Sequence, residues 1–446
     1  MAAPAQLDRR ASAPGRGTLP PMSGTAAERA ARAVARVRAL APLSEQEGGL
    51  TRRYGSQALV QTMAMAEEWL RGAGLATSRD GIGNLLGRLE GATPGLPALV
   101  LGSHLDSVAD AGIWDGPLGV VLALDQAERC AATGAAAGAA RGTALPFALE
   151  VAAFADEEGL RFPTAYLGSQ VWAGLWDDAQ LELRDAGGVT VHEAVLAMGG
   201  DPARIAQGAR RPEELLGWCE VHIEQGTRLE RAGVPLGVVT AIQGQSRCTA
   251  VFTGQAGHAG TTAMDARRDA LLAAAEWALA VEAEGRATPG LVATVGRLQV
   301  EPGAANVIPG LVSATLDARH PDDAVRQAAT ATLEAAARRL AAARGVGLEW
   351  RQDTDNAAVV FSPRLCALLH EAAAGAQGAP APDLPSGAGH DAVPLSRITE
   401  VSMLFVRCRD GISHNPLEHV EEADVAAAIA ALDRLIDQLA AQLRAG

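Results

Sequence analysis

The sequence of 446 residues contains no lysine, because all 38 of its basic residues are arginine. This absence excludes enzymes that form a Schiff base on a lysine and enzymes that hold phosphates with a P-loop lysine. Acidic residues outnumber the arginines and give a formal net charge of −14. We therefore expect no nucleic-acid partner, because phosphate binding needs a basic surface.

Cysteines and long apolar runs are also scarce. The five cysteines are scattered and form no CxxC pair, which is typical of reduced thiols and favours a cytoplasmic location. No apolar run approaches the roughly 20 residues of a membrane span, so no membrane association is expected. Residues 1–24 are rich in Ala, Pro, Gly and Arg without the apolar core of a signal peptide, and we expect them to be a disordered leader.

Recurring apolar stretches indicate an α/β fold. The chain is too long for one ordinary core, so two domains are expected. Stretches rich in Val, Leu, Ile and Phe lie at residues 98–102, 146–155, 218–223 and 401–406, with helical segments between them. Such runs are typical of a sheet that is buried on both faces. Each stretch ends at a cluster of acids and histidines, and ligands bind beyond the carboxyl ends of strands in such sheets.

The pattern changes between about residues 237 and 352. Strands are expected at 238–242, 249–253, 293–300 and 312–318, and alanine-rich helices at 265–284 and 322–343. A β-α-β-β-α-β order predicts an inserted, ferredoxin-like α+β unit that would be a lid or dimerisation domain. The metal-binding catalytic domain would then comprise residues 25–236 and 353–446.

The first cluster contains His104, Asp106 and Asp115. His104 and Asp106 are two residues apart at the end of a predicted strand, so their side chains point to the same side. A carboxylate beside a ligating imidazole fixes its tautomer, which gives Asp106 a supporting role. Asp115 follows a loop that contains glycine and can approach a metal, although a surface turn would also explain it.

The other clusters are Glu157-Glu158, His222, and Ser413-His414 with Glu418. Two adjacent carboxylates repel each other unless one binds a metal while the other takes a proton. Taken singly, these clusters also fit a solvated acidic loop, a hydrogen-bonded core histidine and a helix N-cap. Together they supply the imidazole nitrogens and carboxylate oxygens that divalent metals bind, which predicts a two-metal hydrolytic site.

Seven longer strings resemble the hydantoinase/carbamoylase branch of the dinuclear metallopeptidase-like amidohydrolases. This branch includes N-carbamoyl-L-amino-acid hydrolases, allantoate amidohydrolases and β-ureidopropionases. The strings are residues 102–108, 157–162, 222–226, 257–262, 306–309, 386–392 and 411–416. The resemblance implies a zinc-exopeptidase-like catalytic domain with a mixed, mainly parallel sheet. In the peptidase relatives an acid usually occupies the position of His222, so a histidine there indicates the ureido-hydrolysing branch.

The resemblance also implies the cofactor. Two divalent ions are expected in each subunit, zinc or manganese, with cobalt or nickel as alternatives. Asp115 would bridge the two ions. Four further ligands would complete the two sites: His104 and His222 for one ion, Glu158 and His414 for the other.

The remaining roles follow from the same resemblance. Glu157 would be the general base, with Asp106 assisting the catalytic site. His258 would stabilise the oxyanion and reach the site of the neighbouring subunit in a homodimer formed through the lid. Four residues would contact the small-molecule substrate: Gln225, Asn306, Arg319 and His390.

We therefore expect a metal-dependent amidohydrolase that cleaves the ureido C–N bond of an N-carbamoyl amino acid or related ureido acid and releases ammonia. One alternative is an aminoacylase or dipeptidase of the same superfamily, and His222 in place of an acid counts against it. Another is a non-catalytic binding protein on the same fold. The complete set of ligands and the base count against that alternative.

Overall fold

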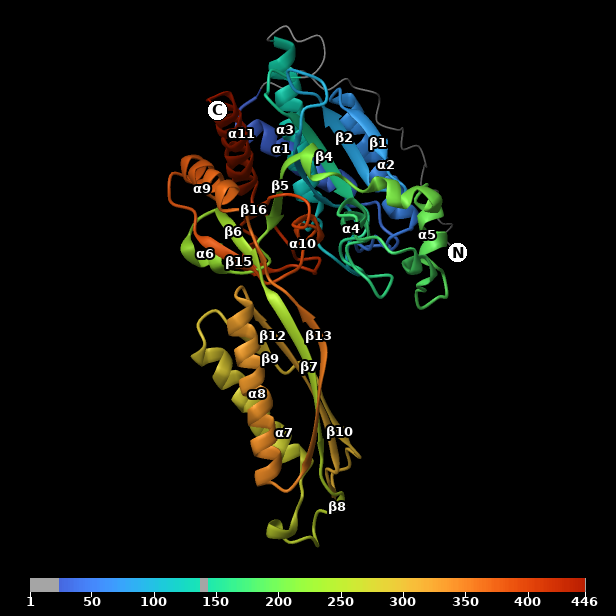
Figure 1. Cartoon of the computed structure of the whole chain (residues 1–446), viewed down its shortest axis with the longest axis vertical. Coiled ribbons are helices and arrows are strands. Elements are labelled where there is room, and N and C mark those ends of the chain that lie inside the picture. The colour runs from blue at the N-terminus through green and yellow to red at the C-terminus, as the bar shows by residue number, and fades with distance from the viewer. Residues whose placement is uncertain (1–23, 137–142, 446) are drawn as a thin grey trace, which may run out of the picture.

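The computed structural model describes residues 24–136 and 143–445, so the leader predicted for residues 1–24 lies outside the described residues except for Gly24. The chain forms a larger unit around a nine-stranded sheet and a smaller unit around a five-stranded sheet (Figure 1). Each unit has its own hydrophobic core, and the two cores share no residue. The predicted α/β fold with a mixed sheet is confirmed.

The larger sheet has the strand order β1-β2-β4-β3-β5-β16-β6-β14, and β15 pairs with β6. The four central strands β4, β3, β5 and β16 are parallel to one another. β1, β2, β6 and β14 pair antiparallel toward the two edges, and β15 pairs parallel with β6. Every residue of β3, β4 and β16 is buried, as expected from their continuous apolar sequences. The strands are β1 (Ala76–Arg79), β2 (Leu85–Leu89), β3 (Ala98–His104), β4 (Ala148–Phe154), β5 (Leu215–Ile223), β6 (Leu236–Ile242), β14 (Val359–Val360), β15 (Asp383–Ser386) and β16 (Val401–Val406).

Helices cover this sheet, and α1, α2, α5 and α9 begin at a Ser or Thr side-chain cap. Thr25 opens the first helix with a capping box, in which its hydroxyl accepts from the Glu28 backbone N–H and Glu28 accepts from the Thr25 backbone N–H. Among the described residues, no helix combines the length and the apolar character needed to cross a bilayer. The helices are α1 (Ala26–Leu40), α2 (Gln57–Gly72), α3 (Pro117–Ala136), α4 (Leu167–Trp172), α5 (Val191–Ala197), α6 (Arg228–Ala232), α9 (Pro363–Gln377), α10 (Ala392–Leu395) and α11 (Glu422–Ala445).

A buried ion-pair network joins α1, α3 and α11. The Arg29 guanidinium donates to Asp125 on α3 and to Asp433 on α11, and the side chains of Arg29 and Asp125 are almost fully buried. Removing one partner of such a buried pair typically costs about 3–5 kcal/mol, because the remaining charge stays buried and unpaired. The network therefore fixes how these three helices pack beside the sheet.

The parallel strands bring the predicted site residues to one edge of the sheet. His104 is the last residue of β3, and Glu157 and Glu158 follow directly after β4. His222 is the penultimate residue of β5, and the segment after β16 leads to His414. Because parallel strands end at the same edge, residues separated by more than 300 positions meet there.

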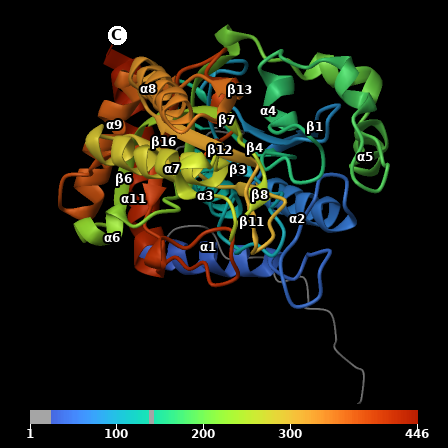
Figure 2. The same cartoon turned by 90° about the horizontal axis from the view of Figure 1, so that it is seen from below.

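The smaller unit is a twisted antiparallel sheet with the order β10-β12-β7-β13, and β9 pairs with β12. Helices α7 and α8 lie side by side along one face of this sheet (Figures 1 and 2). Buried and partly exposed residues alternate along β12, as expected for a sheet with one covered face. The elements are β7 (Gly244–Thr253), β8 (Gly257–His258), α7 (Ala270–Ala287), β9 (Val292–Thr294), β10 (Leu298–Glu301), β11 (Val307–Ile308), β12 (Leu311–His320), α8 (Asp323–Ala343) and β13 (Gly347–Asn356).

Three details differ from the sequence prediction. The strand expected at 238–242 is β6, which pairs with β16 in the larger sheet instead of opening the inserted unit. Its apolar sequence predicts a buried strand but does not tell which sheet the strand joins. The strand expected at 293–300 is divided into β9 and β10, with Gly296 between them. β13 was missed because most of its residues are polar and exposed, so it has no apolar alternation.

Candidate metal centre

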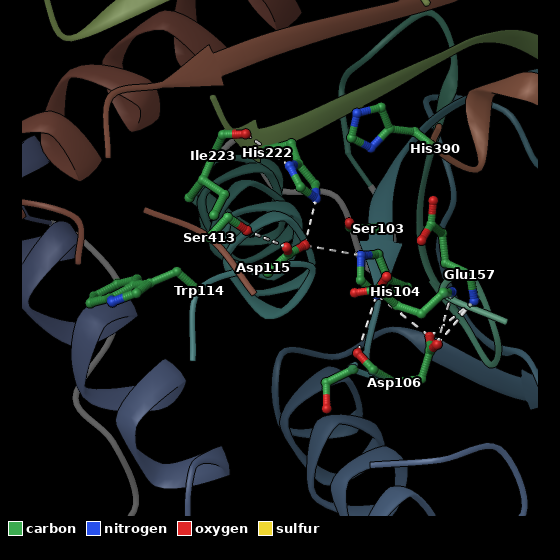
Figure 3. Close-up of polar contacts among 12 residues, drawn as sticks. Ser103, His104, Asp106, Trp114, Asp115, Glu157, His222, Ile223, His390 and Ser413 are labelled. Atoms are coloured by element: carbon green, nitrogen blue, oxygen red, sulfur yellow. Dashed lines mark hydrogen bonds and ion pairs between the residues drawn. The ribbon is translucent and has the colours of Figure 1, made fainter. Parts of the chain in front are cut away.

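The centre is organised around the carboxylate of Asp115, whose side chain lies after β3 and is buried, with 4% of the residue exposed. Its Oδ1 atom lies 2.9 Å from Nε2 of His222 and 3.5 Å from Nε2 of His104 (Figure 3). Its Oδ2 atom lies 3.4 Å from Nε2 of His414, and that nitrogen lies 3.7 Å from Oε1 of Glu158. The two oxygens of one carboxylate thus face two different sets of donors.

Backbone carbonyls set the tautomers of the two buried histidines. Nδ1 of His222 lies 2.9 Å from the carbonyl oxygen of Ile223, and Nδ1 of His104 lies 3.2 Å from that of Asp106. A carbonyl oxygen can only accept, so each Nδ1 carries a proton, and in the neutral imidazole each Nε2 then presents a lone pair toward Asp115. Nε2 of His222 is buried without a hydrogen-bond partner among the described residues, although it faces Asp115. Two lone pairs that face each other are the arrangement of two ligands of one cation.

Asp106 joins the ends of β3 and β4. Its carboxylate accepts hydrogen bonds from the backbone N–H groups of Glu157 and Glu158, each at 3.1 Å. It therefore fixes the turn that carries both glutamates beside His104.

Other side chains hold Asp115 in place. Nε2 of Gln225 donates to its Oδ2 at 2.8 Å, and the Ser413 hydroxyl donates to the same oxygen at 2.9 Å. Oε1 of Glu418 accepts from the backbone N–H groups of Trp114 and Asp115, at 2.7 and 3.1 Å. Gln225 is itself in the left-handed region, with φ of 56°, as is His414, with φ of 54°. Non-glycine residues in this region are strained and tend to cluster at functional sites.

The carboxylates of the centre are crowded in a site with little water. Burial raises the pKa of Glu157 well above its ordinary value, with a further contribution from Glu158 against the opposing effect of His104. Burial and the neighbouring Asp115 raise the pKa of Glu158 to about 7. Burial alone would raise the pKa of Asp115, but the neighbouring imidazoles of His222 and His104 hold it well below its usual range. This group of buried acids requires positive charge close by.

Within the described part of the chain, four groups of three residues could hold a metal ion, because their ligand atoms lie within 4.8 Å of one another. All of them combine carboxylate oxygens with imidazole nitrogens, a donor set that suits zinc or manganese. The groups are His104, Asp115 and His222; Asp115, Glu158 and His414; His104, Glu157 and Glu158; and Glu220, His222 and His390. The first two share Asp115, so the residues present fit two divalent ions on either side of this carboxylate.

A cavity of about 310 Å³ opens onto these ligands. Gln225 and His390, which were predicted to contact substrate, line it together with the predicted base Glu157. Two lining residues with polar side chains, Tyr166 and Arg247, were not predicted. Arg247 lies in an ordinary polar stretch of β7, and Tyr166 takes a left-handed φ of 62° before α4, so neither carries a sequence signal of its own.

Arg319 lies in an adjoining cavity instead of the metal cavity. This second cavity has a volume of about 890 Å³ and lies between the two units. Tyr166, Ala388 and Gly389 line both cavities. The two cavities therefore adjoin. Arg247 lines the cavity that contains the predicted ligands, whereas Arg319 lines only the second cavity.

His258 and Asn306 lie together, but at neither cavity. His258 ends β8, which pairs with β11, and the carbonyl of Asn306 accepts from the Ala259 backbone N–H at 3.0 Å. Both side chains are exposed, and β8 lies at the end of the smaller unit that is remote from the larger unit (Figure 1). Within one chain these two residues do not meet the metal ligands.

Comparison with known proteins identifies the family. Residues 100–438 match Peptidase family M20/M25/M40, and the chain belongs to this family. It is 38% identical over 435 residues to a protein of Oryza sativa subsp. japonica named probable allantoate deiminase, covering 91% of this chain and 87% of that protein. It is also 38% identical over 396 residues to an N-carbamoyl-L-amino acid amidohydrolase of Geobacillus stearothermophilus, covering 89% of this chain and 95% of that one.

A solved structure of an amidase of the hydantoinase/carbamoylase family from Burkholderia multivorans is similar over the whole fold. The TM-score is 0.84 at 34% sequence identity, and the match covers 91% of this chain and 97% of that chain. The expected resemblance to this branch is confirmed, and so is the prediction of a hydrolase.

Asp115 belongs to two of the candidate metal-binding groups, so its substitution should change the metal content. Asp115→Asn keeps the size of the side chain and removes the charge that faces both sets of donors. We expect the reconstituted protein to fall from about two bound ions per chain to fewer than about one, because both sites lose a ligand. Metal analysis after desalting measures this directly. A chelator should lower the Tm of the wild type and have little effect on the Tm of the variant.

A histidine–aspartate pair outside the centre supplies the control. Nε2 of His370 lies 2.7 Å from Oδ1 of Asp383, and His370→Ala should leave the metal content unchanged. Retention of both ions by Asp115→Asn would contradict the assignment.

Proposed function

We propose that this protein hydrolyses the ureido C–N bond of an N-carbamoyl amino acid or a related ureido acid at a centre of two divalent ions. The observation that carries the proposal is the position of Asp115 between two sets of donors, one of which includes His222. A histidine at position 222 favours ureido substrates over peptides. The relatives named as allantoate deiminase and N-carbamoyl-L-amino acid amidohydrolase support the same substrate class. A cytoplasmic location stays a prediction from the sequence.

In this proposal His104 and His222 would hold one ion, Glu158 and His414 would hold the other, and Asp115 would be shared by both. Zinc and manganese both accept such mixed nitrogen and oxygen ligands. When bound, the ions supply Lewis acidity to the substrate carbonyl and to the attacking water.

Glu157 is the proposed general base. It lines the cavity, and the hydrogen bond from its backbone N–H to Asp106 holds the turn that carries it beside His104. Its carboxylate takes a proton from the attacking water and then delivers that proton to the leaving nitrogen as the C–N bond breaks. Ammonia leaves, and the carbamic acid that remains loses carbon dioxide.

Gln225 is the proposed contact for the ureido group. Its Nε2 is already used by Asp115, whereas its Oε1 is buried without a hydrogen-bond partner among the described residues. A buried amide oxygen without a donor is costly, and a ureido N–H in the adjacent cavity would satisfy it. Arg319 offers a fork of N–H groups for the substrate carboxylate from the adjoining cavity, and His390 lines the metal cavity.

A panel of substrates tests this function together with the base. The wild type should release ammonia from one or more of N-carbamoyl-L-amino acids, 3-ureidopropionate and allantoate, and a chelator should abolish the release. Glu157→Gln should lower turnover by about 10²–10⁴-fold, the usual contribution of a general base, while the bound metal is retained.

Glu213→Gln, at an exposed acid remote from the cavity, is the matched control and should behave as the wild type. Cleavage of dipeptides with no release of ammonia from any ureido acid would overturn the substrate class. Near-normal turnover by Glu157→Gln would overturn the assignment of the base.

We also propose that the active protein is a homodimer in which the partner supplies His258 and Asn306. Both residues are exposed at the remote end of the smaller unit, so a second copy is needed to bring them to a metal cavity. The smaller unit carries apolar surface suited to such contact, since Leu272 and Leu279 lie one heptad apart on α7 and are 42% and 67% exposed.

Mixing two inactive variants tests this shared site. His258→Ala and Glu157→Gln each remove one required group, but a heterodimer of the two contains one cavity with Glu157 intact and His258 supplied by the partner. We therefore expect activity to return when the subunits are exchanged, at up to about a quarter of the wild-type level for random pairing. If both residues act within one chain, the mixture stays inactive, which would contradict the proposal.

A further inference from the structure

Arg247 is the one guanidinium among the residues that line the metal cavity. It is the fourth residue of β7, close to the junction with β6 and therefore to the larger unit. Three carboxylates line the same cavity, those of Asp115, Glu157 and Glu158. A substrate group that accepts hydrogen bonds would be repelled by these acids and attracted by Arg247.

The terminal N–H groups of Arg247 are free to bind such a group. Its Nε donates to Oδ2 of Asp317 at 3.1 Å, and its Nη1 and Nη2 make no hydrogen bond with another described residue. The side chain is 54% exposed. Arg319, in contrast, donates to Asp317 through Nε and Nη2 and to the carbonyl of Gly387 through Nη1.

Asp317 holds both arginines in fixed positions. It stands directly opposite Arg247 in the β12–β7 pairing, and Nε2 of Gln245 also donates to its Oδ2, at 3.0 Å. Arg247 therefore faces the metal cavity while Arg319 faces the adjoining cavity, and one carboxylate sets the distance between the two guanidiniums.

The composition of the metal cavity wall indicates what Arg247 binds. The aliphatic side chains in this wall are only those of Ala165 and Ala388, so an apolar substituent would gain little from burial there. A planar carbonyl group would instead receive two hydrogen bonds from the Arg247 fork. A ureido acid whose single acceptor arm is bound at Arg319 would leave Nη1 and Nη2 of Arg247 without a partner among the described residues.

We propose that Arg247 is a specificity-determining residue that binds a second substituent of the substrate with hydrogen-bond acceptors. This substituent is a second ureido group or a second carboxylate. Arg319 binds the first carboxylate. This inference rests on the proposed ureido hydrolysis. The substrate is then a ureido acid whose central carbon carries two arms with hydrogen-bond acceptors, in place of a simple aliphatic N-carbamoyl amino acid.

Steady-state kinetics of Arg247→Leu with three substrates tests this inference. Allantoate carries a second ureido group, N-carbamoyl-L-aspartate carries a second carboxylate, and N-carbamoylglycine carries neither. We expect kcat/KM to fall by about 10- to 150-fold for the preferred two-armed substrate, the range for losing hydrogen bonds to a charged group. For N-carbamoylglycine the change should stay within about threefold. The two-armed substrate with the larger fall in kcat/KM shows whether Arg247 binds a ureido group or a carboxylate.

Two further variants complete the experiment. Arg351→Leu removes the same charge from neighbouring β13, where the side chain is 61% exposed and outside both cavities, and should leave all three rates unchanged. Arg247→Lys keeps the charge without the fork and should recover only part of the lost activity. The Tm of each variant shows that the fold is retained.

Equal losses on all three substrates would overturn the inference and leave the proposed function standing, because Arg247 would then hold the carboxylate common to them. An unchanged kcat/KM of Arg247→Leu on all three substrates would also overturn it. If the wild type releases ammonia from none of them while cleaving dipeptides, the proposed function fails and the inference fails with it.

Discussion

The buried carboxylate of Asp115 is compatible with its surroundings only if positive charge lies on both of its sides. Glu157 and Glu158 stand close by, and the Nε2 atoms of His104 and His222 face it while their Nδ1 atoms face backbone carbonyls. Keeping such acids ionised without counter-ions costs several kcal/mol for each charge. The surrounding hydrogen bonds serve this constraint, since those from Gln225 and Ser413 hold the Asp115 carboxylate itself and the backbone carbonyls orient His104 and His222 toward it.

Both units contribute residues to the site. The parallel strands of the larger sheet hold the ligands rigidly, and β7 of the smaller unit brings Arg247 to the same cavity. His258 and Asn306 lie at the other end of that unit, separated from the ligands of their own chain (Figure 1). If a second copy supplies His258 and Asn306, water is excluded from the metal cavity only when these residues of the partner have reached it. The reaction would then be favoured in that assembled site.

Much of this arrangement was predictable from the sequence, because apolar runs that end in acids and histidines give both the strands and their active edge. The motif strings contain four of the five proposed ligands and the proposed base Glu157, and Asp115 follows the first string after a loop that contains glycine. The position of β6 was not predictable, since its apolar residues fit either sheet. Arg247 was missed for a related reason: its proximity to the cavity depends on the pairing of β7 with β12, which no local pattern encodes. The separation of Arg319 from the metal cavity likewise depends on how the units sit together.

The central claim is that Asp115 is shared by two ions. Anomalous diffraction from crystals of the manganese- or zinc-loaded protein locates bound metals directly. Our account predicts two peaks about 3.5–4 Å apart, one beside Oδ1 of Asp115 with His104 and His222, the other beside Oδ2 with Glu158 and His414. A single peak, or peaks that do not touch Asp115, would contradict it.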